Sequence, residues 1–189
     1  MGITMHADKE ILNHVAPSPH KEPPKEITFR AWRRDDISIL ARLGQELYHY
    51  IDTIDPVWRT SPHAGDNLRA HLDELYTKRY AITYVACAPQ AIIGFITGTI
   101  ILRPPVILPL RDGLIDNAFV TSSWRDKGIG TRLAHMMLAW FRDQGVDEVR
   151  IHYQVSNTRA VAFWERIGFR SWTMQAHLWL YPEKTKKAL

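Results

Sequence analysis

The segment from Arg125 to Thr131 holds the residues with the clearest chemical use. Two glycines, Gly128 and Gly130, follow a cationic stretch and open a run of apolar residues at helical spacing. The first amides of a helix have no intrahelical acceptor, and with the positive end of the helix dipole they attract anions. Glycine has no Cβ, so a bulky diphosphate can approach the backbone. The segment therefore predicts a site for a phosphorylated ligand.

Two familiar phosphate motifs do not fit this segment. No glycine follows three residues beyond Gly130, as the dinucleotide fingerprint requires, and no Gly-Lys-Ser/Thr is present. A bare Gly-x-Gly at a helix start also suits a simple tight turn. The wider spacing adds Val120 and Arg125 at fixed offsets, and the whole pattern resembles the acetyl-CoA signature of the GCN5-related N-acetyltransferase (GNAT) superfamily, Val-x-x-x-x-Arg-x-x-Gly-x-Gly/Ala.

A second segment, Asn157–Phe169, resembles the later motif of the superfamily, Asn-x-x-Ala-x-x-Phe-Tyr-x-x-x-Gly-Phe. From the residues alone, Asn157 or Ser156 is a good helix N-cap and Gly168 a good helix end. The chain departs from the motif at Trp164, which stands where relatives have a tyrosine that acts as general acid. An indole N–H cannot deliver a proton at neutral pH. Core packing and a missing proton donor both remain open for Trp164.

The resemblance implies acetyl-CoA as cofactor. Its pantetheine arm is expected against the main chain of the strand that ends near Val120, and its diphosphate against the amides after Arg125, with charge from Arg125 or Lys127. The cofactor-binding residues implied in this way are Phe119, Val120, Thr121, Arg125, Asp126, Lys127, Gly128, Ile129, Gly130, Thr131, Asn157 and Phe163.

Asp116 is the expected catalytic carboxylate. It lies four residues before Val120, and the stretch Leu114–Val120 is similar to the equivalent stretch of acetyltransferases that act on small amines. Asp116 could remove a proton from the amine through water, or anchor a cationic amine. A carboxylate that only makes local hydrogen bonds is the alternative.

A loop, broken by Pro56, is expected from Tyr48 to Trp58, and its aromatic and acidic residues suit an amine acceptor through cation–π and ionic contacts. Tyr48 and Trp58 are therefore expected to bind substrate together with Asp116. The same residues would equally suit a loop that its aromatic side chains fold over the core.

The resulting hypothesis is an acetyl-CoA-dependent N-acetyltransferase that acts on a primary amine of a small molecule by direct attack on the thioester. Two alternatives stay open: acetylation of a protein or peptide, and a non-catalytic coenzyme A-binding regulatory module. A homodimer through the last strands is an expectation of the resemblance alone.

Composition limits the other classes. The chain has 189 residues, a formal net charge of +4 and a single cysteine, Cys87, which suits a reducing cytoplasm. No apolar run reaches the ~20 residues of a membrane span, and no secretory signal is evident. The cations form no dense stripe with stacking aromatics, so no nucleic-acid partner is expected. The histidines show no metal-ligand spacing, so no metal is expected.

Hydrophobic periodicity indicates one mixed α/β (α+β) domain that positions these residues. The resemblance implies the GNAT fold: a mostly antiparallel twisted sheet of roughly six to seven strands with a splayed fourth and fifth strand, and about four helices. An extended or partly disordered arm is expected at 1–25, the acetyltransferase domain at 26–182 and a basic tail at 183–189. Expected strands are 27–33, 81–88, 91–102, 114–121, 149–153 and 169–181, and expected helices start near 36, 66, 129 and 157.

Overall fold

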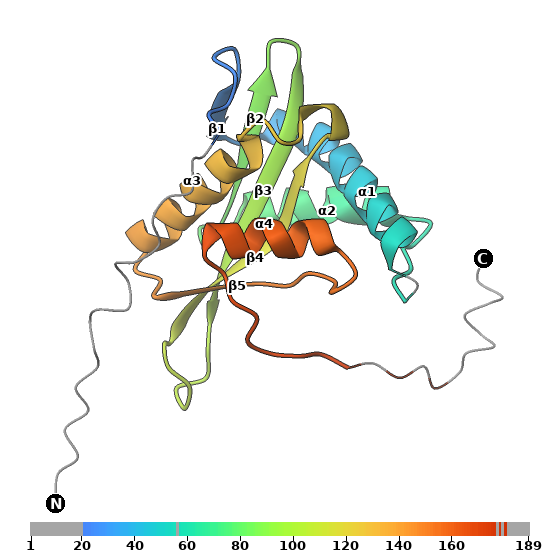
Figure 1. The fold of residues 1–189 in the computed structure, drawn as a ribbon. Coiled ribbons are helices and arrows are strands. Elements are labelled where there is room, and N and C mark those ends of the chain that lie inside the picture. Colours follow the sequence, from blue (N-terminus) through green and yellow to red (C-terminus); the bar gives the residue numbers. More distant parts are fainter. Residues whose placement is uncertain (1–20, 56, 177, 179, 181–189) are drawn as a thin grey trace, which may run out of the picture.

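A single mixed sheet organises the chain (Figure 1). The computed structural model describes residues 21–55, 57–176, 178 and 180. Neighbouring strands follow the order of the sequence, antiparallel from β1 to β4, and β5 lies parallel to β4. The strands are β1 (Thr28–Ala31), β2 (Ala81–Ala88), β3 (Ala91–Leu102), β4 (Arg111–Val120) and β5 (Glu148–Ile151).

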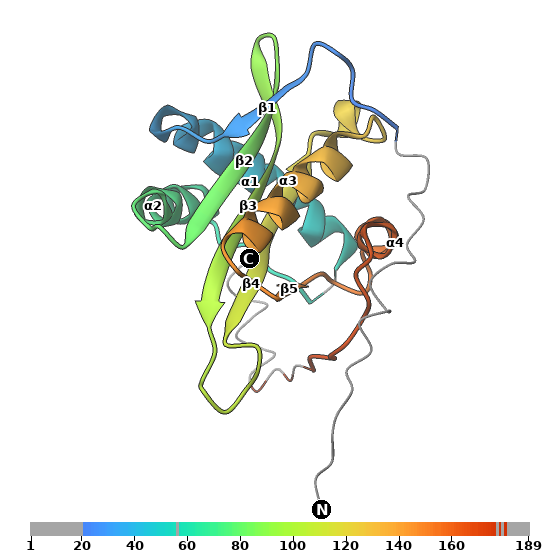
Figure 2. The same cartoon turned by 90° about the vertical axis from the view of Figure 1, so that its left-hand side faces the viewer.

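Helices cover both faces of this sheet, α1 and α2 on one side and α3 and α4 on the other (Figure 2). The helices are α1 (Ile37–Ile54), α2 (Ala64–Tyr76), α3 (Ile129–Asp143) and α4 (Thr158–Ile167), with 3₁₀ turns at Arg34–Asp36 and Ser122–Trp124. Alternation along β3 splits its side chains between the layers, so Phe95 packs with Leu40 of α1 while Ile96 packs with Met137 of α3. Each fully buried side chain of this kind contributes about 1.5–3 kcal/mol of burial free energy.

Most of the expected elements are confirmed, as is the α/β fold class with its GNAT-type order. The strands β2 and β3 have the predicted bounds, and α3 ends just before Gly145, whose φ is +68°. At the start of α4 the Asn157 side chain accepts a hydrogen bond from the Ala160 amide at 3.1 Å, and Gly168 at its end has φ +113°. Gly145 after α3 and Gly168 after α4 both have left-handed backbone dihedrals, which favour glycine.

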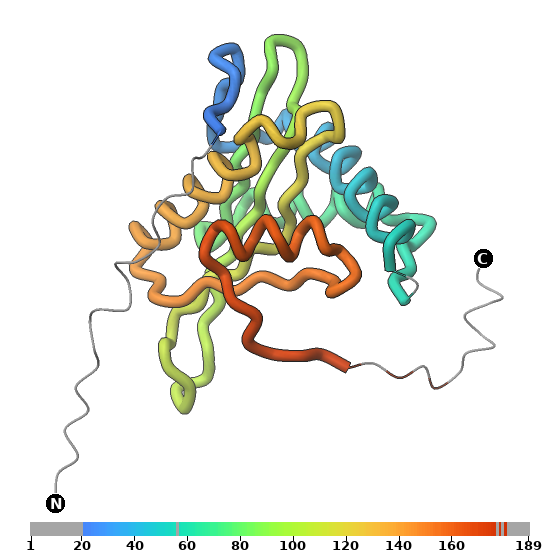
Figure 3. Tube along the Cα trace, viewed as in Figure 1, coloured from blue at the N-terminus to red at the C-terminus, as the bar shows by residue number. Residues whose placement is uncertain are grey.

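The expected count of six to seven strands is wrong for the part of the chain that the structure describes, where the sheet has five. The expected last strand at 169–181 does not form over its described residues, and that segment leaves α4 and runs away from the sheet (Figure 3). Beyond Phe169, which still packs on α4, its large apolar side chains are exposed, Trp172 to 72% and Met174 to 97%. The neighbouring edge strand β5 is only four residues long, so it offers little backbone to pair with.

The expected loop from Tyr48 to Trp58 is wrong in its first half. The helix α1 continues to Ile54, so Tyr48, Tyr50 and Asp52 lie on its last turns. No glycine or proline interrupts this part of the sequence before position 56, and the apolar spacing persists to Ile51, which is buried. The aromatic residues therefore stand on a helix, where their positions are fixed.

A buried ionic cluster ties β4 to β5 near the start of both strands. Asp112 has no exposed surface, and its Oδ2 accepts hydrogen bonds from Arg103 at 3.3 Å and Arg150 at 2.5 Å. The Arg103 guanidinium also donates to Glu148 at 3.0 Å. A buried carboxylate is stable only when cations surround it in this way. The cluster therefore fixes the pairing of β4 with β5 at this end.

The segment Lys21–Lys25, which we call the strap, precedes β1 and packs against the start of α3. It is the described part of the arm that the sequence predicts at 1–25. The rest of that arm and the expected basic tail at 183–189 lie outside the described residues. Of the helices in the described ranges, none is long and apolar enough to cross a membrane.

Candidate active site

The site starts where β4 and β5 part. They pair only from Asp112–Glu148 to Ile115–Ile151, and β5 then ends while β4 continues to Val120. Along this free edge of β4, residues 116–120, no strand of the described chain replaces β5. The sheet thus opens from a paired end to an unpaired one, which confirms the splayed pair expected from the resemblance.

Backbone direction decides which residues serve this free edge. The Thr121 amide donates to the Ile93 carbonyl of β3 at 2.9 Å. Because the direction of these groups alternates along a strand, Ala118 and Val120 turn their N–H and C=O groups toward the free edge. The amide of Thr121 is therefore committed to β3 and not open to the pantetheine contact that the sequence assigned to it. An extended ligand would find its main-chain partners at Ala118 and at the Val120 amide, because the Val120 carbonyl already accepts from Arg125.

Asp116 lies at a β-bulge on this edge. Thr97 pairs with Asn117 and Gly98 with Ile115, so Asp116 has no residue opposite it on β3. A bulge re-aims the side chain of the extra residue. Here the carboxylate accepts a hydrogen bond from the Thr99 hydroxyl at 2.5 Å. In sequence, Asp116 follows the last residue of β4 that pairs with β5, so it stands where the strands separate.

The surroundings of Asp116 favour the protonated form of its carboxyl group. Asp116 keeps exposed surface, but the atoms packed around its carboxyl partly desolvate it and so raise its pKa, while the Thr99 hydrogen bond and the nearby His71 and His152 act in the opposite direction. A carboxylate with a raised pKa accepts a proton more readily than an ordinary aspartate, which suits a general base. His152 follows Ile151, the partner of Ile115, so it lies beside Asp116 at the opening.

The predicted phosphate loop, Arg125–Thr131, has the geometry of an open helix start. Asp126 has φ +61° and Gly128 has φ +77°, which turns the chain into α3. The first helical hydrogen bond runs from the Arg132 amide to the Gly128 carbonyl at 3.0 Å, and no side chain caps the helix. The amides of Ile129, Gly130 and Thr131 precede that bond, so they point out of the helix end, where an anion can accept from them.

The two glycines of the loop face different neighbours. A Cβ at Gly130 would lie 3.4 Å from the Phe163 ring of α4, an ordinary contact, which explains why the family pattern allows alanine there. A Cβ at Gly128 would lie 1.8 Å from the Lys21 carbonyl of the strap, closer than any side chain tolerates. Gly128 is therefore required both by its positive φ and by the strap.

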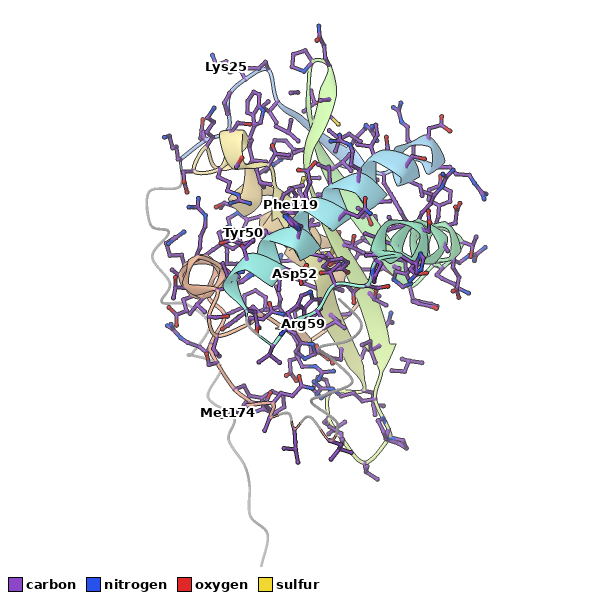
Figure 4. The ribbon with its side chains drawn as sticks, turned by 90° about the vertical axis from the view of Figure 1, so that its right-hand side faces the viewer. Lys25, Tyr50, Asp52, Arg59, Phe119 and Met174 are labelled. Atoms are coloured by element: carbon purple, nitrogen blue, oxygen red, sulfur yellow. The ribbon has the colours of Figure 1, made fainter. Side chains whose placement is uncertain are left out.

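Arg125 of the phosphate loop turns toward the protein and contacts β4 and α1. The Nε of Arg125 donates to the Val120 carbonyl at 2.9 Å, and its guanidinium lies 5.1 Å from the Tyr50 ring and 5.6 Å from the Phe119 ring. Tyr50 comes from α1 and Phe119 from β4, and the two lie close together beside α1 (Figure 4). Arg125 thus links the loop, β4 and α1 through cation–π contacts. Sequence reasoning gave Arg125 only a phosphate-binding part.

The other two charges of the loop also have partners. The Lys127 ammonium lies 4.6 Å from the centre of the Trp124 ring. Asp126 accepts from Arg159 of α4 at 2.6 Å, and this hydrogen bond lowers the pKa of Asp126. The ion pair joins the phosphate loop to α4 at the surface. An exposed ion pair of this kind contributes little stability, but it links the two segments.

Residues expected at the substrate do come together. The Tyr48 hydroxyl donates to Asn117, the neighbour of Asp116, at 3.3 Å, and its ring lies 5.9 Å from that of Trp58. Burial raises the pKa of Tyr48. The structure therefore gathers Tyr48, Trp58 and Asp116 on one side of the β4 edge. The acidic residues nearby make local hydrogen bonds instead of facing the site. Asp52 accepts from the Thr60 amide, and Asp55 accepts from the Val57 amide.

In α4, Trp164 is a core residue. It is 4% exposed, and its ring packs edge-on against Phe163 at 4.8 Å and Phe169 at 5.3 Å. Packing therefore explains this position. Asn157 uses its side-chain oxygen as the helix cap, so only its amide nitrogen is left for a ligand.

Sequence reasoning missed Thr99 and the strap. Thr99 lies in the middle of a strand pattern and meets Asp116 only because of the bulge, for which the sequence carries no signal. The strap was assigned to an arm rich in proline and charge. Its contact with Gly128 depends on tertiary packing, which local composition does not encode.

The residues present fit coenzyme A. The open amides at the start of α3 suit a diphosphate, and the free edge of β4 suits the amide groups of a pantetheine arm. The Thr121 hydroxyl is buried and has no hydrogen-bond partner among the described residues, so it is available to a polar group of a ligand. No three His, Cys, Asp or Glu side chains of the described part gather as metal ligands.

Comparison with known proteins identifies the class. The model of the acetyltransferase (GNAT) family matches residues 45–169. Because this match spans more than half of the sequence, the chain belongs to the GNAT family of acetyltransferases, whose members use acetyl-CoA.

A curated relative and two solved structures agree with this assignment. Mycothiol acetyltransferase from Salinispora tropica is 29% identical over 162 residues, 84% of this chain but 50% of that protein. The chain thus spans about half the length of the curated relatives it matches. An aminoglycoside N-acetyltransferase solved with coenzyme A has a TM-score of 0.65 at 18% identity, over 81% of this chain and 93% of that one. A predicted acetyltransferase from Clostridium acetobutylicum, solved with acetyl-CoA, has a TM-score of 0.68 at 17% identity, over 82% of this chain and 96% of that one.

Proposed function

We propose that this chain transfers the acetyl group of acetyl-CoA to the primary amine of a small molecule, with Asp116 as general base. The observation that carries the proposal is the position of Asp116 at a bulge of β4, next to the last residue that pairs with β5, with its carboxylate held by the Thr99 hydroxyl of β3. The open amides of α3 lie at one end of the free edge of β4 and Asp116 at the other. A cofactor held by both would present its thioester beside the carboxylate.

Acetyl-CoA supplies the thioester carbonyl that the amine attacks. Asp116 takes the proton that the amine must lose, directly or through one water, and its raised pKa helps it to do so. A main-chain N–H on the free edge, at Ala118 or Val120, is placed to stabilise the negative charge that develops on the carbonyl oxygen. The thiolate leaves without a proton from Trp164, which is buried in the core.

The wall beside Asp116 supports a small cationic acceptor. Tyr48 and Trp58 offer aromatic faces, and Asn117 adds a polar group held by Tyr48. Aromatic faces next to a carboxylate attract an ammonium group. The names of the similar proteins, a mycothiol acetyltransferase and an aminoglycoside N-acetyltransferase, also point to small-molecule acceptors.

The test is release of free thiol from acetyl-CoA with a panel of polyamines, amino acids, aminoglycosides and peptides. Turnover with at least one small amine, lost in Asp116→Asn, is the expected result. Turnover confined to peptides would instead identify a peptide acetyltransferase. Tight binding of acetyl-CoA without thiol release from any amine would identify a non-catalytic module.

A further inference from the structure

The Asp116 carboxylate lies on the face of the sheet that α1 and α2 cover. Along β3, Phe95 packs with α1 and Ile96 packs with α3, so Thr99 shares the side of Phe95. Since the Thr99 hydroxyl donates to Asp116 at 2.5 Å, the carboxylate is held on this side too. An acceptor amine that reaches Asp116 therefore enters on the side of these two helices.

His152 points to the same face from the end of β5. Its neighbours Ile151 and Tyr153 both pack against the core under α3, so the His152 side chain between them turns to the opposite side. Ile151 pairs with Ile115 of β4. The next positions of these parallel strands carry His152 and Asp116, so the imidazole and the carboxylate stand next to each other where the strands separate.

A second imidazole reaches Asp116 from α2. His71 lies one helical turn from both Leu68 and Leu75, which are buried, so it stands at the margin of the face that α2 turns to the sheet. Both imidazoles act on the Asp116 carboxyl and lower its pKa. His71 and His152 are exposed residues, so a molecule bound beside Asp116 can contact them.

One carboxylate, that of Asp116, thus stands between two imidazoles. Among the described residues, no second carboxylate acts on the pKa of Asp116. Asp52 and Asp55, which lie near the aromatic wall of the site, use their side chains for local hydrogen bonds to backbone amides. A second ammonium group would therefore lose water without gaining a carboxylate. An imidazole carries an N–H donor in either protonation state, which suits an oxygen of the bound molecule.

We infer that the acceptor carries a single ammonium group next to a carbonyl or carboxylate oxygen, as an α-amino acid or its amide does. Asp116 takes the ammonium, and His71 and His152 donate to the oxygen. This arrangement selects against polyamines and aminoglycosides, which carry several ammonium groups. The inference rests on the proposed function, whose chemistry is unchanged: the C–N bond forms, the C–S bond of the thioester breaks, and the amine proton passes to Asp116.

The experiment measures thiol release from acetyl-CoA by the full chain with four amines: L-phenylalanine, L-phenylalaninamide, phenethylamine and spermidine. Phenethylamine keeps the ring and the amine of the first two but has no carbonyl. With kcat/KM expressed per unprotonated amine, the wild type is expected to prefer a carbonyl-bearing amine by about tenfold, which corresponds to one hydrogen bond. The rates with phenylalanine and its amide then distinguish a carboxylate from a carbonyl.

Variants of the two histidines connect this preference to the site. The double variant His71→Leu/His152→Leu is expected to lose the preference, because kcat/KM falls about tenfold for the carbonyl-bearing amines and stays the same relative to wild type for phenethylamine. His71→Gln/His152→Gln keeps an N–H donor at each position and should retain most of the preference. The matched control is His63→Leu, which removes an exposed histidine at the start of α2 that makes no side-chain cap.

The inference and the proposed function fail in different ways. An equal loss for all amines in the leucine double variant, or a wild-type preference for phenethylamine or spermidine, overturns the inference and leaves acetyl transfer to small amines intact. Acetyl-CoA binding without thiol release with any amine overturns the proposed function itself. A loss confined to the carbonyl-bearing amines, absent in His63→Leu, supports the inference.

Discussion

The Thr99 hydroxyl donates a 2.5 Å hydrogen bond to Oδ2 of Asp116 and so joins β3 to the bulged residue of β4. Thr99 is partly buried, and its rotamers are limited because it is β-branched. The bond holds the carboxylate in one orientation at the point where β4 and β5 separate. It also opposes the rise in the pKa of Asp116 that partial desolvation causes.

Replacing Asp116 tests its part in the reaction. Asp116→Asn keeps the shape of the side chain but cannot accept a proton, so kcat is expected to fall by about 10²- to 10⁴-fold. Affinity for acetyl-CoA, measured by calorimetry, should stay within about twofold, because the amides at α3 are untouched. The control is Asp66→Asn, an exposed carboxylate in the first turn of α2. Wild-type turnover in Asp116→Asn would remove Asp116 from the mechanism.

The acid limb of the rate profile should follow Asp116. Because partial desolvation raises the pKa of this carboxyl, kcat/KM should decline on acidification at a higher pH than an ordinary aspartate would give. Thr99→Val removes a bond that lowers the pKa of Asp116, so the limb should move further toward neutral pH and kcat should drop. Thr99→Ser keeps the hydroxyl and should restore both values. A limb that does not move in Thr99→Val contradicts the assignment.

Replacing Asp116 should lower the activity but raise the free energy of unfolding at neutral pH. A carboxyl whose pKa is raised by folding binds more protons in the folded than in the unfolded chain. Its contribution is therefore lost as pH rises from the ordinary pKa of an aspartate through the raised value. Asp116→Asn should accordingly be more stable than the wild type at neutral pH, and the gain should vanish in acid. Urea titrations at both pH values measure this difference.

Gly128 and Gly145 form a matched pair. Both have positive φ, +77° and +68°, so alanine should cost about 1–2 kcal/mol of backbone strain at either position. Only at Gly128 would the new Cβ meet the strap, since nothing lies within 4 Å of a Cβ at Gly145. Gly128→Ala should therefore also lose acetyl-CoA affinity, by about tenfold or more, while Gly145→Ala should keep it. Equal affinities in the two variants would falsify the role of the strap contact.

Trp164→Tyr separates packing from proton donation. Because Trp164 is buried among Phe163 and Phe169, the smaller ring should leave space and lower the free energy of unfolding by about 1–3 kcal/mol. Turnover at saturating substrate, measured well below the melting temperature, should not increase. An increase in kcat would show that a tyrosine at this position supplies a proton that the wild-type protein lacks.

Local patterns predicted most of the fold. The alternation in β2 and β3, the helical spacing after Gly128 and the cap at Asn157 are each decided by neighbouring residues, so the sequence was sufficient there. The segment after α4 has strand-like alternation of the same kind, but Trp172 and Met174 are exposed because no strand of the described residues lies beside them. Pairing is a tertiary property, which is why that prediction failed.

The sequence predicted which residues form the candidate site better than it predicted how they are arranged. The two motifs placed Asp116 and the phosphate loop near one another, since one strand joins them. The bulge at Asp116 depends on the register between β3 and β4, which no local pattern states. The helical position of Tyr50 and the inward turn of Arg125 also depend on packing between elements far apart in sequence. These contacts became visible only in three dimensions.

The ion pairs around Asp112 hold β4 and β5 together at one end of the strand pair. Since Arg103 and Arg150 hold one end of β4 and β5 together, the two strands can diverge only at the other end, where the hydrogen bonds stop at Ile115. The twist of the sheet rotates neighbouring strands relative to one another, so β4 and the chain after β5 take different directions beyond Ile115. The protein is consequently pre-shaped to accept its cosubstrate without first breaking any strand pairing of its own.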